Sequence, residues 1–342
     1  MKILLIAYYY PPINSGGTIR PLKMTGYLPY FGHQVTVLTH SYEKTDLQNP
    51  AIIRIKDISH NMNRQGFKKV QWLFLRIITE IFNRLGCYRS IYFWWKKSVI
   101  KNGREIIAAA KPGVLLATYP PVETLEIGLE FAAQYGIPLI SDFRDGLLFE
   151  PIETKRIKQY KCIRNRYGEI EKAAAQNSAV ITTIAQPITD YFKQEYGVTD
   201  AHVISSGFDP DDFAHLPGGV IFQPGYFNIV FTGRFALSDR YNRVDFFFEA
   251  LRMLHSEHKE SAAKIKLHLV GEYRKAEILP LQDLIDCGMI VLHGFVEREK
   301  SLAFQQAADL LLIITPPDRR SATSAKIFEY LYAGKPILAL TH

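Results

Sequence analysis

Residues 321–336 combine the signals for a helix start, an acid and a helix stop, in the order Ser-Ala-Thr-Ser-Ala-Lys-Ile-Phe-Glu-Tyr-Leu-Tyr-Ala-Gly-Lys-Pro. Thr323 or Ser324 can cap a helix that begins near Ala325, and Gly334 can end it. The start of a helix offers free backbone amides and about half a positive charge to an anion. A phosphate group would therefore suit this segment.

This helix is flanked by two apolar runs, residues 310–315 and 336–340, so it is predicted to be the crossover of a parallel β-α-β unit. Its first turn then opens at the carboxyl edge of a sheet, where open α/β sheets bind ligands. Glu329 lies on an otherwise apolar part of the helix. Two interpretations follow: its carboxylate binds a ribose diol, or it is solvated on the outer face.

The run from Ser324 to Pro336 resembles the donor-nucleotide motif of the retaining family-4 (group 1) glycosyltransferases, which have the two-domain GT-B architecture. The resemblance implies that a nucleoside-diphosphate sugar is bound by Ser324, Ala325, Lys326, Ile327 and Glu329. Members of this family often carry a second glutamate eight residues before the one at 329. Ser321 stands at that position here, which leaves the contact to the donor sugar hydroxyls unassigned.

Two glycine turns each follow the first predicted strand of a domain. Gly16 and Gly17 follow residues 2–7, and Gly233 follows residues 227–232. Neither turn is a Gly-x-Gly-x-x-Gly or P-loop motif, which argues against dinucleotide and ATP binding. A Gly-Gly pair before a helix is by itself more often only a turn. The family resemblance implies that these glycines face the donor diphosphate and that Arg234 neutralises it.

A third polar segment, Ser-Asp-Phe-Arg-Asp-Gly at residues 141–146, ends another predicted strand. It resembles an Arg-Asp turn in a subgroup of these transferases that build bacterial polysaccharides, and Trp94 and the Tyr-Pro-Pro at 119–121 strengthen that resemblance. Asp142, Arg144 and Asp145 could contact the sugar or the acceptor. Alternatively, they could form an internal salt bridge that stiffens the loop.

The length of 342 residues suits two domains, and 47% hydrophobic with 22% charged residues is typical of a globular protein. Cys87, Cys162 and Cys287 are too few and too widely spaced for a disulfide framework or a zinc site, which favours a reducing cytoplasm. The first seven residues contain a short apolar run but lack a cleavage site, so they are predicted to be a strand and not a signal peptide.

Residues 61–111 carry eleven bases and two acids, a local charge of +9 in a chain whose net charge is +7. Apolar residues over 70–85 follow the period of an amphipathic helix, and aromatic residues alternate with bases over 88–104. One interpretation is two helices that pack on the sheet with solvated basic faces. The other is a patch that lies on an anionic membrane. Nucleic acid is not expected as a partner because no nucleic-acid module is recognised.

The remaining chain alternates strands and helices, which predicts an α/β fold with two Rossmann-like doubly wound parallel sheets facing a cleft. We expect an acceptor-side domain at 1–205, a linker at 206–226 and a nucleotide-sugar-binding domain at 227–342. The second domain is expected to be incomplete, because the family continues beyond the strand at 336–340. Asp209, Asp211 and Asp212 in the linker superficially match an Asp-x-Asp metal motif, but turn and cap chemistry is predicted for them.

The resemblance implies a retaining, metal-independent glycosyltransferase that moves a sugar from a nucleoside-diphosphate sugar to a glycan or lipid-linked acceptor in cell-surface polysaccharide synthesis, such as that of lipopolysaccharide. No cofactor beyond this donor is expected. The implied catalytic residues are Arg234, Glu329, Asp142, Arg144 and Asp145. The expected location is the cytoplasm, with peripheral attachment to the inner face of the membrane. The alternatives are a nucleotide-sugar epimerase or hydrolase of the same fold, and a non-catalytic, truncated donor-binding protein.

Overall fold

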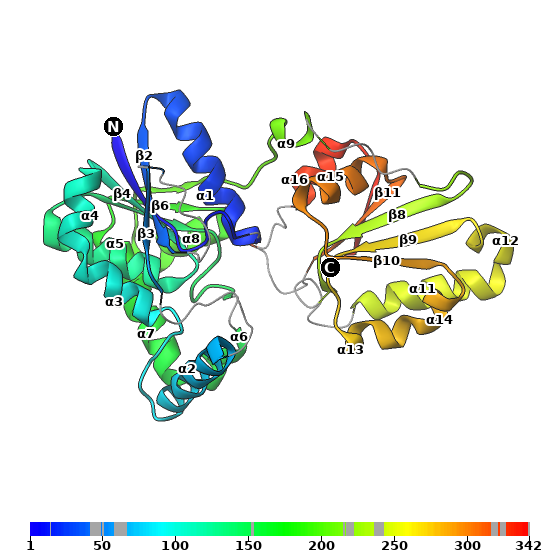
Figure 1. The fold of residues 1–342 in the computed structure, drawn as a ribbon, viewed down its shortest axis with the longest axis horizontal. Coiled ribbons are helices and arrows are strands. Elements are labelled where there is room, and N and C mark those ends of the chain that lie inside the picture. The colour runs from blue at the N-terminus through cyan, green and yellow to red at the C-terminus, as the bar shows by residue number, and fades with distance from the viewer. Residues whose placement is uncertain are drawn as a thin grey trace. The chain divides into compact units, whose positions relative to one another are not determined.

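The computed structural model describes residues 1–13, 15–41, 49, 51–57, 67–151, 154–214, 216, 222–235, 243–315, 321 and 326–340, with the backbone alone at 67–69, 71–72, 154–155 and 243–244. The chain forms two compact units, residues 1–205 (unit 1) and 206–342 (unit 2). Each unit contains one parallel sheet with helices on both faces (Figure 1). The predicted α/β fold with two doubly wound parallel sheets is confirmed.

The sheet of unit 1 has seven strands in the order β3-β2-β1-β4-β5-β6-β7. Its central strands are apolar on both faces because helices cover both, as a parallel sheet requires; all six residues of β4 are buried. The order reverses between β1 and β4, a point where the carboxyl ends of strands form a ligand crevice in folds of this kind. The strands are β1 (Lys2–Ile6), β2 (Gln34–His40), β3 (Ile52–Ile55), β4 (Val114–Tyr119), β5 (Leu139–Phe143), β6 (Val180–Thr183) and β7 (Ala201–Val203).

The helices of unit 1 largely follow the sequence pattern. The amphipathic helix expected over 70–85 is α2. After β1 the chain forms α1 and then a 3₁₀ turn, because Pro29 cannot donate a helical hydrogen bond. The helices are α1 (Gly16–Tyr27), η1 (Leu28–Phe31), α2 (Phe67–Arg84), α3 (Phe93–Lys101), α4 (Gly103–Ala110), α5 (Val122–Tyr135), α6 (Thr154–Gln159), α7 (Lys161–Asn177) and α8 (Gln186–Tyr196).

Unit 2 has a five-stranded sheet in the order β10-β9-β8-β11-β12. Its strands are β8 (Phe227–Thr232), β9 (Ile265–Val270), β10 (Ile290–Gly294), β11 (Leu310–Ile314) and β12 (Ile337–Leu340). Its helical segments are α9 (Asp211–Ala214), α11 (Arg243–Glu257), α12 (Lys259–Ala262), α13 (Lys275–Ile278), η2 (Leu279–Leu281), α14 (Gln282–Asp286), α15 (Arg298–Ala307) and α16 (Lys326–Ala333). The segment predicted as a linker therefore includes the short helix α9.

The β-α-β unit predicted around residues 321–336 is confirmed. Helix α16 follows β11 and precedes β12, and these two strands pair in parallel. The helix ends where predicted, since Gly334 adopts φ +68°, the left-handed conformation that glycine tolerates best. Because β11 also pairs with β8, the start of α16 lies at the same sheet edge as the turn after β8.

Candidate functional site

The carboxyl end of β8 and the first turns of α16 form one corner of unit 2, which we call the β8–α16 corner (Thr232, Gly233, Arg234, Lys326, Glu329 and Tyr330). The fully buried Tyr330 fixes it: its hydroxyl accepts a hydrogen bond from the Thr232 amide at 3.2 Å and lies 3.1 Å from the Thr232 hydroxyl. A buried tyrosine hydroxyl needs such partners. The strand end and the helix are thereby held together.

Lys326 brings a cation directly to the turn after β8. Gly233 has φ +119°, a backbone conformation that favours glycine, and a Cβ atom added to it would have to displace the Lys326 ammonium. The ammonium also lies 4.8 Å from the centre of the Phe231 ring. Burial lowers the pKa of Lys326 to about 8, although the nearby Glu329 carboxylate acts in the opposite direction. This poorly solvated cation would gain from an anionic partner.

Arg234 supplies a second cation at the rim of the corner. Its Nη2 atom donates to Glu272 Oε2 at 2.8 Å, and more than half of each of these two side chains is exposed. An ion pair this exposed contributes about 0–1 kcal/mol. Arg234 can therefore exchange Glu272 for a phosphate group at little cost.

Glu329 is not solvated, so that interpretation of the sequence is wrong. Its side chain is only 12% exposed; Oε1 accepts from Arg298 Nη1 at 2.8 Å, and Oε2 accepts from Gln305 Nε2 at 3.2 Å. Arg298 also donates to Asp212 Oδ2 at 3.0 Å. Burial alone would lower the pKa of Arg298, but these two carboxylates raise it overall. The Glu329 carboxylate is thus held in place by Arg298 and Gln305.

The other residues of unit 2 that the sequence predicted for the donor site contribute less to the β8–α16 corner. Ile327 packs against the apolar core, and Ser321 is buried. Ser324 and Ala325 lie outside the described residues. In the segment after unit 1, Asp209 Oδ1 accepts from the Asp211 amide at 3.0 Å, which is the turn chemistry predicted there.

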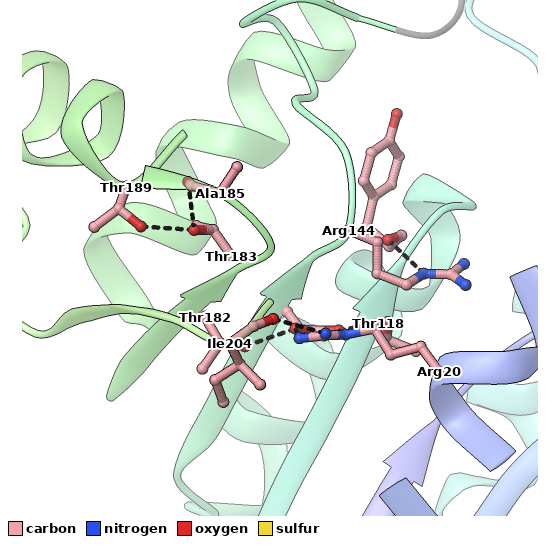
Figure 2. A network of polar contacts seen from close by, with 10 residues as sticks. Arg20, Thr118, Arg144, Thr182, Thr183, Ala185, Thr189 and Ile204 are labelled. Carbon is pink, nitrogen blue, oxygen red and sulfur yellow. Dashed lines mark hydrogen bonds and ion pairs between the residues drawn. The ribbon is translucent and has the colours of Figure 1, made fainter. Parts of the chain in front are cut away.

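In unit 1, Asp142 is the centre of a buried polar network. Figure 2 labels three of its partners, Arg20, Thr118 and Thr182. Arg20 donates to both carboxylate oxygens, at 2.7 and 3.0 Å, and the hydroxyls of Thr118 and Thr182 donate one bond each, at 2.7 and 2.8 Å. Burial acts to raise the pKa of Asp142, but Arg20 and the two hydroxyls lower it overall. With four donors and no exposed surface, Asp142 matches the internal salt bridge better than a direct contact to substrate.

Arg144 connects two loops at the carboxyl edge of this sheet. Its guanidinium donates to three backbone carbonyls: Tyr119 at 3.1 Å, Pro120 at 2.8 Å and Gly17. Burial lowers its pKa, while the charges of Asp142 and Asp145 oppose this shift. Arg144 therefore positions the glycine loop and the Tyr-Pro-Pro loop relative to each other.

The two glycines of that loop differ in their surroundings. A Cβ atom on Gly17 would lie only 3.1 Å from the Tyr9 ring, whereas one on Gly16 would meet open space. A side chain at Gly17 would thus crowd the Tyr9 ring, whereas the space beside Gly16 is open. That Gly16 and Gly17 face the donor diphosphate stays a prediction.

The structure reveals three functional candidates that sequence reasoning missed: Arg298 and Gln305, which hold Glu329, and Tyr330, which fixes the corner. Tyr330 directly follows Glu329 in the motif, so the sequence could have indicated that it lies at this site. Arg298 and Gln305 lie on α15, and nothing in their own sequence context indicates a link to α16. Within the described part of the chain, no group of three or more His, Cys, Asp or Glu side chains could hold a metal ion.

One comparison with known proteins matches only the second part of the chain. Residues 226–342 match the family model described as Glycosyl transferases group 1. A comparison with curated proteins found no match.

Solved structures resemble the chain over nearly its whole length. Sucrose-phosphate synthase from Thermosynechococcus elongatus has a TM-score of 0.66 at 14% identity, covering 98% of this chain and 80% of that one. Anabaena HepE in complex with UDP has a TM-score of 0.58 at 15% identity, covering 99% and 80%. WaaG, a glycosyltransferase involved in lipopolysaccharide biosynthesis, has a TM-score of 0.58 at 17% identity, covering 98% and 80%. At these identities the likeness establishes the fold.

Proposed function

Because residues 226–342 match the group 1 glycosyltransferase family model and the chain has the GT-B fold, we propose that the β8–α16 corner binds the diphosphate and ribose of a nucleotide-sugar donor. The observation that carries this proposal is the Lys326 ammonium beneath the Gly233 turn, with Arg234 at the rim. Two cations and a glycine turn suit a diphosphate, because the backbone can approach closely and the Lys326 charge is poorly solvated.

Glu329 would accept hydrogen bonds from the ribose hydroxyls. Its carboxylate is fixed by Arg298 and Gln305 before any ligand arrives, so little rotamer freedom is lost on binding. Each carboxylate oxygen can accept more than one hydrogen bond, which leaves capacity for a diol.

We propose transfer with retention of configuration and without a metal. The bond between the sugar C1 and the diphosphate oxygen breaks, and the bonding electron pair leaves with the nucleoside diphosphate. Lys326 and Arg234 stabilise the negative charge that develops on that oxygen. The acceptor hydroxyl forms the new bond to C1 and gives its proton to the leaving phosphate, so the products are a glycoside and a nucleoside diphosphate.

A thermal-shift panel of nucleoside diphosphates and nucleotide sugars tests donor binding directly. UDP derivatives are the first candidates, since the structurally similar HepE was solved with UDP. We expect at least one of these ligands to stabilise the wild-type chain, and we expect Arg234→Ala and Glu329→Ala to weaken its binding about tenfold or more, the effect of losing a charge-assisted hydrogen bond. Unchanged binding in both variants would contradict the proposed site.

For the acceptor, we propose a glycan or lipid-linked glycan in cell-surface polysaccharide synthesis, with the chain acting in the cytoplasm at the inner membrane face. Support comes from the apolar face of α2 and the residue that follows it, which are formed by Val70, Leu73, Phe74, Ile77 and Ile81 on the helix and by Leu85 just after it, each 49–73% exposed. Bases such as Arg76 and Arg84 accompany it within the strongly basic segment 61–111. An exposed apolar face beside basic residues fits an anionic bilayer surface. Among the described helices, none is long and apolar enough to span a membrane.

Phe74→Glu tests this surface. We expect the wild-type chain to co-sediment with vesicles containing phosphatidylglycerol and not with phosphatidylcholine vesicles, and we expect the variant to bind at least tenfold more weakly, because it removes buried apolar area and adds repulsion. Phe246→Glu on α11 is the matched control, since Phe246 is also exposed but lies in unit 2. If Phe74→Glu and Phe246→Glu bind the phosphatidylglycerol vesicles equally well, the proposal of membrane binding through α2 is contradicted.

A further inference from the structure

An ion pair attaches the short helix α9, in the predicted linker at 206–226, to the β8–α16 corner. Asp212 of α9 accepts a hydrogen bond from Arg298 Nη2 at 3.0 Å, and Arg298 Nη1 donates to Glu329 at 2.8 Å. These three side chains are only 12–28% exposed, so water and salt screen their charges less than those of a surface ion pair. One guanidinium therefore joins the linker to the carboxylate that we assign to the ribose.

Aromatic contacts hold α9 against α16 independently of this ion pair. The ring of Tyr332 on α16 lies 4.6 Å from the ring of Phe213 and 4.5 Å from that of Phe208, measured between ring centres. Phe213 is buried. Because these contacts do not involve Asp212, removing its carboxylate should leave α9 docked. The effect of such a change then falls on Arg298 and Glu329.

The orientation of Arg298 determines how many acceptor positions Glu329 keeps. A guanidinium and a carboxylate form their strongest pair when two parallel hydrogen bonds engage both carboxylate oxygens. Here Arg298 gives Glu329 a single bond, to Oε1, because Asp212 engages Nη2. Glu329 Oε2 accepts instead from Gln305 at 3.2 Å. Without Asp212, Nη2 can turn to Oε2 and take up acceptor capacity that a ligand would otherwise use.

The balance of charge acts in the same direction. Two carboxylates share one guanidinium, so Asp212, Arg298 and Glu329 together carry a formal charge of −1. Hydrogen bonds to an ionised acceptor are stronger than those to a neutral one. Removing Asp212 leaves a neutral pair, in which Glu329 is a weaker acceptor for hydroxyl groups.

We propose that Asp212 is a positioning residue for the donor: it holds Arg298 so that Glu329 stays able to accept from the 2′- and 3′-hydroxyls of the ribose. The assignment rests on the proposed function, because it needs Glu329 to bind the ribose. Coupling between two contacts is reciprocal. A bound ribose therefore stabilises the contact between Arg298 and Asp212, and donor binding tightens the attachment of α9.

The test compares UDP with 2′,3′-dideoxy-UDP by isothermal titration of the full chain, with another base if the thermal-shift panel selects one. The measured quantity is the ratio of the two dissociation constants, because effects on the phosphates or on folding weaken both ligands and cancel. We expect wild type to prefer UDP at least tenfold. Asp212→Ala should lower this preference at least threefold, and Glu329→Ala should lower it to about one.

Asp211→Ala is the matched control, since Asp211 is the exposed neighbour of Asp212 on α9, and it should change the preference less than about twofold. If Asp212→Ala does not fold, Asp212→Asn keeps the shape of the side chain, removes its charge and should lower the preference at least twofold. Hydrogen exchange gives a second measurement. At equal occupancy, UDP should protect the amides of residues 211–214 more than dideoxy-UDP does.

Two outcomes separate this inference from the proposed function. A preference that Asp212→Ala leaves unchanged and Glu329→Ala abolishes would overturn the role of Asp212 and keep the ribose contact of Glu329. A wild-type preference near one would contradict that ribose contact, and the role of Asp212 with it.

Discussion

Replacing Lys326 by methionine lowers kcat/KM for release of the nucleoside diphosphate from the nucleotide sugar by about 10²- to 10³-fold, the usual effect of removing one preorganised group that stabilises a leaving oxyanion. Methionine keeps an unbranched apolar side chain of nearly the same length beside Phe231 and Gly233 but removes the charge. The loss therefore reports electrostatics and not packing. The measurement is steady-state kinetics at saturating acceptor, or donor hydrolysis while the acceptor is unknown.

Lys335→Met is the matched control, because Lys335 follows the same helix but is not part of the β8–α16 corner, and it should leave kcat/KM within about twofold of wild type.

The pH profile of kcat/KM gives a second check on the role of Lys326. The pKa of Lys326 is lowered to about 8, so the free enzyme loses this positive charge as the pH rises through about 8. Wild-type kcat/KM should fall above that pH, and the fall should be absent in Lys326→Met. A Lys326→Met variant with wild-type kcat/KM would contradict the role given to this ammonium.

Asp142→Ala lowers the free energy of unfolding by about 3–5 kcal/mol, measured by chemical denaturation, because it leaves the Arg20 guanidinium buried without its carboxylate. The pKa of Asp142 is lower in the folded chain than its ordinary value. Its contribution to stability is therefore present above pH about 4 and is lost as the pH falls through the folded-state pKa. Acid should destabilise the wild type more than the variant.

Two controls separate a structural role of Asp142 from a contact to substrate. Asp200→Ala removes an exposed acid of the same unit and should cost less than about 1 kcal/mol. The double variant Arg20→Met with Asp142→Leu should regain most of the lost stability, since apolar residues can replace a buried pair. If that double variant is stable but binds donor and acceptor normally without turnover, Asp142 acts in the reaction and the structural assignment fails.

The sequence predicted the architecture well because the signals for it are local. The run 326–333 carries its own start, apolar face and stop, and α16 forms with Gly334 in the left-handed conformation. The parallel sheets follow from strands that alternate with helices. Segment 88–104 was less clear, since its aromatic residues and bases fit either a packed or an exposed helix, and α3 in fact buries Trp95 and leaves Trp94 partly exposed.

The site could be predicted only in part, because partners distant in sequence determine what a side chain does. From the sequence alone, Glu329 could equally well bind a ribose or be solvated. The structure decides between these interpretations, because it places Arg298, 31 residues away, beside the carboxylate. From the sequence alone, Asp142 could contact the substrate. The structure instead shows Arg20, 122 residues away, donating to both of its carboxylate oxygens. Glu123, in the first turn of α5, is not part of any recognised motif, and its burial is a property of the folded chain alone.

Isothermal titration of the full chain with a nucleoside and with its diphosphate, using the base that the thermal-shift panel selects, tests the donor site most directly. The β8–α16 corner predicts that the diphosphate binds wild type at least tenfold more tightly than the nucleoside, because Lys326 and Arg234 both meet the phosphates. Lys326→Met and Arg234→Ala should each remove most of this difference and leave the affinity for the nucleoside unchanged. Equal affinity of wild type for the two ligands, or an equal loss of both in the variants, would contradict it.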